Sequence, residues 1–108
     1  MFVSDSCAGL AWMIEIEFHP EATEELEQSA AWYQERSDAA AKGFALAVDA
    51  AINKISQQPE RFPRVDKRHR ACNLTKYPFQ IIYRQEGEKI YIIAVAHAKR
   101  RPGYWRFR

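Results

Sequence analysis

The residues of this 108-residue chain most able to do chemistry are ten cations gathered in two short stretches. They are Arg61, Arg64, Lys67, Arg68 and Arg70 in the first stretch, and Lys99, Arg100, Arg101, Arg106 and Arg108, interleaved with Tyr104, Trp105 and Phe107, in the second. Cations mixed with aromatic rings can contact phosphates and stack on bases. They suit equally well an acidic protein segment that folds over them, with Tyr104 or Trp105 as an anchor. A solvated rim explains some of the ten. We favour the acidic protein segment, because it needs no special geometry at a catalytic centre.

His97 is the side chain best suited to proton transfer near neutral pH. It ends an apolar stretch, Ile90 to Ala96, and strict alternation places it on the side of Tyr91 and Val95. A histidine at the end of a strand is more often a hydrogen-bonded edge residue than a catalyst, and we favour that interpretation. The three histidines and two cysteines have no metal-ligand spacing, so we expect no metal and no cofactor. A glycine-rich phosphate loop and a nucleophile elbow are also missing from the sequence.

The charge is divided unevenly along the chain. Residues 1–60 carry 3 basic and 11 acidic residues, whereas residues 61–108 carry 13 basic and 3 acidic ones. The second part should therefore attract polyanions or an acidic partner, unless the two parts neutralise each other across the fold.

The composition indicates one soluble domain. The chain is 47% hydrophobic and 28% charged, which excludes disordered and collagen-like classes. No apolar run approaches the roughly 18–20 residues that cross a bilayer, so we expect no membrane association. Two cysteines, Cys7 and Cys72, make no disulfide framework, which favours the cytoplasm. Residues 1–12 make a poor secretory signal, and we interpret them as a dispensable extension before a single domain at 13–108.

The first half of the domain predicts a strand and two helices. Residues 14–18 alternate apolar and acidic side chains, as in a half-buried strand. Pro20 then opens a helix that should run to about Arg36, and Ser37-Asp38 breaks it and caps a second helix that Pro59 ends. The expected buried faces are Ala22, Leu26, Ala30 and Tyr33 on the first helix, and Phe44, Val48, Ala51, Ile52 and Ile55 on the second.

The second half predicts three strands, at residues 71–75, 79–84 and 90–97, with Gly87 in a tight hairpin between the last two. The last strand is apolar on both faces, which is typical of a central strand covered on both sides. The expected fold is α+β, in the order β-α-α-β-β-β. Its helical hairpin packs on one face of a mostly antiparallel four-stranded sheet, whose other face stays open for a partner.

These segments together resemble the RelE/ParE toxin superfamily of type II toxin–antitoxin modules, and within it the ParE-like plasmid stabilisation subgroup. The resemblance runs from about Ile14 to Trp105. The segments that carry it are Phe18-His19-Pro20-Glu21-Ala22, Ala31-Trp32-Tyr33, Gln58-Pro59-Glu60-Arg61-Phe62-Pro63, Tyr77-Pro78-Phe79-Gln80-Ile81-Ile82-Tyr83, Val95-Ala96-His97 and Arg100-Arg101-Pro102-Gly103-Tyr104-Trp105. The resemblance implies a toxin that a cognate antitoxin neutralises in a hetero-oligomer.

The resemblance also implies two possible targets, since RelE-like members cleave messenger RNA on the ribosome and characterised ParE-like members poison DNA gyrase. RelE-like nucleases commonly carry an arginine just before the apolar-apolar-Tyr of the penultimate strand, where this chain has Gln80. Glutamine cannot neutralise a phosphate, which counts against cleavage. Candidate substitutes for an endonuclease are Arg84, His97, Arg100 and Tyr104, although Arg84 is equally a cross-strand partner for Glu86 or Glu88.

The leading hypothesis is therefore a toxin that acts on gyrase by protein–protein contact. Its expected partner-binding residues are Arg61, Arg64, Arg68, Arg70, Gln80, Arg101, Tyr104 and Trp105. The alternatives are a metal-independent, ribosome-dependent endoribonuclease and a non-toxic relative that only binds its partner.

Overall fold

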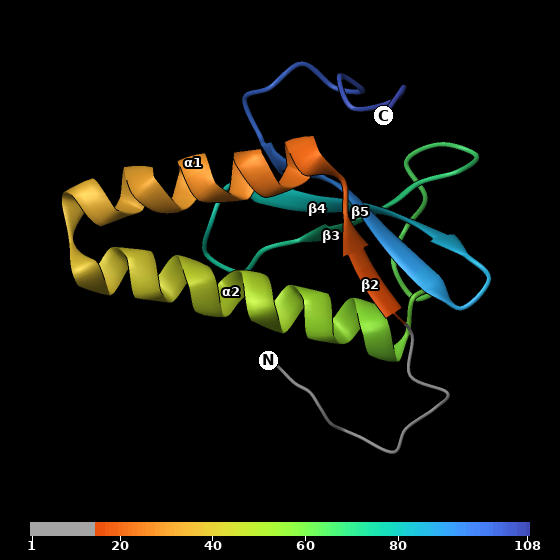
Figure 1. Ribbon diagram of the computed structural model, residues 1–108, viewed down its shortest axis with the longest axis horizontal. Helices are drawn as coiled ribbons and strands as arrows, with labels where there is room; N and C mark the ends of the chain where they lie inside the picture. The colour runs from red at the N-terminus through yellow and green to blue at the C-terminus, as the bar shows by residue number, and fades with distance from the viewer. Residues whose placement is uncertain (1–14) are drawn as a thin grey trace.

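The computed structural model describes residues 15–108, so the expected extension at 1–12 lies outside the described residues. Within them the chain forms one four-stranded sheet and two helices that lie side by side (Figure 1). In chain order the elements are β2 (Glu15–Phe18), α1 (Pro20–Arg36), α2 (Asp38–Gln57), β3 (Arg70–Asn73), β4 (Phe79–Glu86) and β5 (Lys89–His97). The predicted α+β order is confirmed.

The first helix begins where the sequence places proline. Pro20 occupies the first turn, where its missing N–H leaves no hydrogen bond unmade. His19 is the N-cap, and its ring Nδ1 accepts a hydrogen bond from the backbone N–H of Glu21 at 3.1 Å. The expected buried face is confirmed, because Ala22 is fully buried and Leu26 packs against the same core.

The second helix follows after a single residue. Ser37 caps it, since the Ser37 hydroxyl accepts a hydrogen bond from the N–H of Ala40 at 2.9 Å. Four of the five expected side chains are buried, Phe44, Val48, Ala51 and Ile55, and the fifth, Ile52, is partly buried against the same core. The short connection makes α1 and α2 an antiparallel hairpin, and α1 also packs along β5.

The strand order in the sheet is β2-β5-β4-β3. β2 pairs with β5 in parallel, and the other two pairings are antiparallel. Gly87 in the β4–β5 hairpin has a φ of 62°, which explains the glycine. The expected strand at 71–75 is shorter than predicted, because the chain turns after Asn73 and Lys76 takes a φ of 71°.

A β-bulge in β5 overturns one prediction. Ile82 pairs with Ala94 and Tyr83 with Ile92, so Ile93 is an extra residue in the ladder. The extra residue reverses the alternation for the rest of the strand. His97 consequently lies on the helix-facing side with Val95, and Tyr91 lies on the opposite side.

The expectation of an open second sheet face is wrong. The face opposite the helices carries its own buried cluster, in which Trp105 from the C-terminal tail packs beside Ile82 and Ile93. Trp105 is only 6% exposed. The tail at residues 101–108 therefore covers part of this face, which agrees with the apolar character of β5 on both sides.

Candidate functional site

The two basic stretches meet on the face opposite the helices. The ring of His69, at the end of the first stretch, lies 4.9 Å from the ring of Trp105 in the second. Nearby, Arg106 Nε lies 3.8 Å from Asp66 Oδ2. The loop at residues 61–69 and the tail at 101–108 are therefore neighbours. We call the surface that they form together with Arg84 the basic face.

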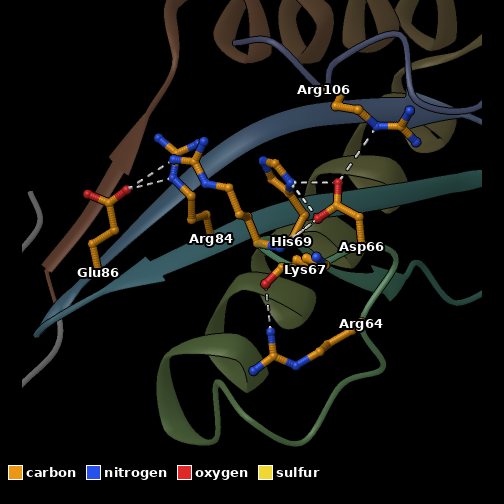
Figure 2. Close-up of polar contacts among 8 residues, drawn as sticks. Arg64, Asp66, Lys67, His69, Arg84, Glu86 and Arg106 are labelled. Atoms are coloured by element: carbon orange, nitrogen blue, oxygen red, sulfur yellow. Dashed lines mark hydrogen bonds and ion pairs between the residues drawn. The ribbon is translucent and has the colours of Figure 1, made fainter.

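An Asp–His pair joins the two stretches (Figure 2). His69 is 1% exposed, and its Nδ1 lies 2.9 Å from Asp66 Oδ1 and 3.0 Å from Oδ2. Burial by itself would raise the pKa of Asp66, but hydrogen bonds from the backbone N–H of Arg68 and from His69 lower it below its ordinary value. The carboxylate fixes the Nδ1–H tautomer of the neutral ring, which makes Nε2 the acceptor.

His69 Nε2 is buried and has no hydrogen-bond partner among the described residues. The sequence pattern suggested His69 only as a possible metal ligand, so the pair of Asp66 and His69 was not predicted. The Asp-x-x-His spacing in a turn was the available signal, because residues three apart in a turn can contact each other.

Arg84 lies on the same face, as its parity with Gln80 and Ile82 predicts. Its Nε donates to Glu86 Oε2 at 2.7 Å, and Arg68 Nη2 lies 3.9 Å from the same oxygen. Figure 2 shows Arg84 turned toward Glu86. The carboxylate therefore neutralises part of the charge of Arg84, whose partner is on its own strand rather than across the hairpin.

Three arginines of the first stretch line a shallow cavity of about 230 Å³ together with Glu60 and Gln85. Arg64 Nη1 donates to the backbone oxygen of Lys67 at 3.0 Å, and Arg70 Nη1 donates to that of Phe62 at 2.7 Å. These two arginines shape the loop, whereas Arg68 has its side chain 65% exposed. In the first stretch, Arg64 and Arg70 therefore stabilise the loop, whereas Arg68 is accessible to a partner.

The remaining predicted partner-binding residues divide in the same way. Arg61 is exposed, with its guanidinium 5.8 Å from the ring centre of Phe62, and Arg101 is also exposed. Gln80 donates from Nε2 to Asn73 Oδ1 at 2.9 Å. Trp105 is buried against His69, so in this conformation it anchors the tail to its own sheet rather than to a partner.

The end of the tail is held by Glu25 of α1. Glu25 accepts hydrogen bonds from the hydroxyl of Tyr104 at 2.8 Å, from both terminal nitrogens of Arg108 at 3.0 and 2.9 Å, and from the N–H of Val95 at 3.0 Å. Arg108 also donates to the backbone oxygen of Ile93 at 3.0 Å. We call these contacts the tail lock. They supply hydrogen-bond partners to the backbone N–H of Val95 and the backbone oxygen of Ile93, which lie on β5 beyond the end of β2.

The pKa values at the tail lock follow from burial and hydrogen bonding. Burial and the hydrogen bond to Glu25 both raise the pKa of Tyr104. Burial alone would raise the pKa of Glu25, but the hydrogen bonds from Arg108, Tyr104 and Val95 lower it. The hydroxyl of Tyr104 is therefore committed to Glu25.

The structure does not bring the four candidate nuclease residues together. Arg84 pairs with Tyr91 near the start of β5, and His97 follows six positions later, about 20 Å along an extended strand. The bulge also puts these two side chains on opposite sides of the sheet. Arg84 is the residue set apart, because the guanidinium of Arg100 lies 3.9 Å from the ring centre of Tyr104 and the backbone N–H of Arg100 donates to the backbone oxygen of His97 at 3.0 Å.

His97 is hydrogen-bonded at the end of β5. Its Nδ1 accepts a hydrogen bond from the N–H of Lys99 at 3.0 Å, and its ring lies 4.9 Å from that of Phe79. No group of three His, Cys, Asp or Glu side chains within residues 15–108 is arranged to hold a metal ion. Neither helix in this part of the chain is long and apolar enough to cross a membrane.

Comparison with known proteins decides the family. The family model that describes the ParE toxin of the type II toxin–antitoxin system parDE matches residues 16–102. The chain belongs to the ParE toxin family. Among solved structures, it is similar to a chain of a chromosomal ParDE toxin–antitoxin system from P. aeruginosa, with a TM-score of 0.69 and 17% identity over 82% of this chain and 100% of that one. A search of curated proteins finds no match.

The two comparisons support the fold and the class of protein, and they cover most of the described residues. The structural likeness supports the fold, with the helical hairpin on one side of the sheet, and the family match makes this chain a type II toxin. The matched range contains β2 to β5 and the loop at 61–69, but ends before Gly103. Trp105 and the tail residues of the tail lock, Tyr104 and Arg108, therefore lie beyond the part that the family model describes, whereas Glu25 lies within it.

Proposed function

We propose that this ParE-family toxin is neutralised by a cognate antitoxin and acts by protein–protein contact on DNA gyrase. The observation that carries the second part is the separation of Arg84 from His97, at opposite ends and on opposite sides of the sheet. Cleavage of RNA without a metal needs a base, an acid and cations around one phosphate. Inhibition of gyrase by protein–protein contact needs only a complementary surface and no such catalytic arrangement.

Antitoxin binding is supported by the charge of the basic face. Arg61, Arg68, Arg101 and Arg106 are exposed there, and they are suited to the carboxylates of an acidic segment that orders as it binds. The similar P. aeruginosa chain comes from a ParDE toxin–antitoxin system. The tail presents part of this charge, so the surface that we propose is built on the tail rather than on a bare sheet.

The gyrase part of the proposal is tested with purified proteins. The toxin is incubated with gyrase, ATP and supercoiled plasmid, and the reaction is stopped with detergent and protease. We expect linear DNA, because a trapped cleavage complex leaves broken strands when gyrase is digested. Intact plasmid at a tenfold excess of toxin would overturn this part of the proposal.

A translating extract tests the endonuclease alternative. We expect the 5′ ends of its transcripts to stay unchanged when the toxin is added. New ends that appear only in translated messages would establish cleavage instead.

The antitoxin part is tested by charge reversal. The double variant R68E/R101E should lose binding to the antitoxin, because it reverses two exposed charges on the basic face. The matched control is K42E/K76E, which reverses two exposed charges outside the basic face. Equal antitoxin binding by the two double variants would count against this surface.

A further inference from the structure

A second cavity lies away from the basic face, between α1 and the end of the sheet where β4 begins and β5 ends. Its volume is about 300 Å³, at the low end for ligand pockets. Residues of α1 form one wall, Pro78 and Phe79 form another, and His97 and Lys99 complete the rim. The function proposed above assigns nothing to this cavity.

The walls of the cavity are aromatic and fixed in place. Trp32 meets Tyr33 edge to face with ring centres 5.0 Å apart, and Phe79 meets His97 in the same way at 4.9 Å. Trp32 is nevertheless 51% exposed, which is unusual for the largest apolar side chain. The guanidinium of Arg36 lies over the Trp32 ring, 3.4 Å from the ring centre. A large apolar side chain entering here would meet rigid rings that lose little freedom on binding.

The polar groups around the cavity are mainly hydrogen-bond donors. Because His97 Nδ1 accepts the N–H of Lys99, the neutral ring carries its proton on Nε2, which is then a donor. Lys99 contributes an ammonium group and Ser29 a hydroxyl. The lining residues include no carboxylate. Glu25, one turn before Ser29 on α1, is already engaged by Arg108.

We propose that this cavity binds a peptide segment of a partner protein in which a large apolar side chain stands next to a carboxylate. The apolar side chain lies against Trp32 and Phe79, and the carboxylate is held by Lys99 and His97. The positive rim and the absence of lining carboxylates favour this occupant over a neutral or basic one. The inference rests on the proposed function, in which the segment belongs to the antitoxin, and places it at a second contact besides the basic face.

The experiment uses two short probes and the ¹⁵N-labelled toxin. The first probe is the peptide Ac-DFLE-NH2, and the second is its neutral counterpart Ac-NFLQ-NH2. In NMR titrations we expect the acidic peptide to shift the indole N–H of Trp32 and the backbone N–H of Lys99. The neutral peptide should bind about fivefold more weakly, because the loss of an exposed ion pair lowers affinity by about this factor. Shifts confined to residues 61–70, or equal affinities of the two peptides, would overturn the inference.

Variants separate the cavity from the rest of the surface. Lys99→Glu should weaken binding of Ac-DFLE-NH2 by about fivefold or more, and Trp32→Ala by about tenfold or more. Lys42→Glu reverses an exposed charge on α2 and is the control, expected to bind as the unaltered chain does. Both test positions are exposed, so the variants should fold, and their thermal unfolding checks this. Unchanged binding by folded Lys99→Glu and Trp32→Ala would refute the inference.

The inference and the proposed function fail in distinguishable ways. The gyrase assay contains no peptide, so its outcome is independent of the cavity. If the cavity takes no acidic peptide but R68E/R101E still loses the antitoxin, the inference is wrong and antitoxin neutralisation through the basic face stands.

Discussion

The tail lock predicts that Glu25 is one of the most important polar residues for stability. Replacing Glu25 with alanine removes the acceptor of four hydrogen bonds and leaves the guanidinium of Arg108 buried, since that side chain is only 10% exposed. Removing one partner of a buried ion pair costs about 3–5 kcal/mol. Arg108 keeps its bond to Ile93 and lies 3.6 Å from Glu21, so we expect the low end, about 3 kcal/mol.

Urea and thermal unfolding measure this loss. For a domain of this size, about 3 kcal/mol corresponds to a fall in Tm on the order of 10–20 °C. Glu27→Ala is the matched control, because Glu27 is exposed on the same helix. We expect the control to stay within about 0.5 kcal/mol of the unaltered protein. The reasoning is refuted if Glu25→Ala is no less stable than the control.

Because of the tail lock, the free energy of unfolding should depend on pH in the acidic range. Its hydrogen bonds lower the pKa of Glu25 in the folded state despite burial, whereas the unfolded carboxyl keeps the ordinary value of 4.5. The folded protein therefore binds this proton less tightly than the unfolded chain. The stabilisation is fully present above the unfolded pKa and is lost as the pH falls below about 4.5 toward the folded pKa. Glu25→Gln should lack this part of the pH dependence.

Three further predictions concern other parts of the fold. Trp105→Ala should lower the free energy of unfolding by about 3 kcal/mol, measured in urea, since it empties the space beside His69 and Ile93. Gly43→Ala should destabilise because its Cβ would meet the hydroxyl of Tyr77, and adding Tyr77→Phe should restore stability measured by thermal unfolding. Burial raises the pKa of Tyr83 to about 12, so absorbance at 295 nm should show late-ionising tyrosines, and Tyr83→Phe should remove the part due to Tyr83 while that of Tyr104 remains. Because the folded state holds this proton longer, that variant should also lose less stability between about pH 10 and 12.

The helices and the order of the elements along the chain could be predicted because their signals are local, whereas the strand order β2-β5-β4-β3 in the sheet was not predicted. The apolar spacing on α2, the proline at the start of α1 and the glycine in the hairpin each depend on a few neighbouring residues. The bulge at Ile93 has no such signal, since Ile92, Ile93 and Ala94 are all apolar and fit either side of a covered strand. One extra residue was enough to move His97 to the face opposite Arg84.

The candidate site could be predicted in its residue types but not in their arrangement. Two basic stretches far apart in sequence indicated a charged surface, and the structure brings them together through His69 and Trp105. The sequence does not show which aromatic side chain of the tail turns inward. Trp105 does so and Phe107 is 96% exposed, because the sheet face offers Trp105 an apolar site beside Ile82.

The position of the accessible arginines of the tail, Arg101 and Arg106, therefore depends on the tail being held. Trp105 fixes the middle of the tail against the sheet, and Arg108 fixes its end to Glu25. Arg106 lies between these two points and faces Asp66, which orients His69. A bare sheet would offer a partner mainly apolar surface with Gln80 and Arg84, whereas the held tail adds further charge at defined places. The basic face is thus a product of tertiary packing, and a change that releases the tail should weaken partner binding even where it removes no arginine from that face.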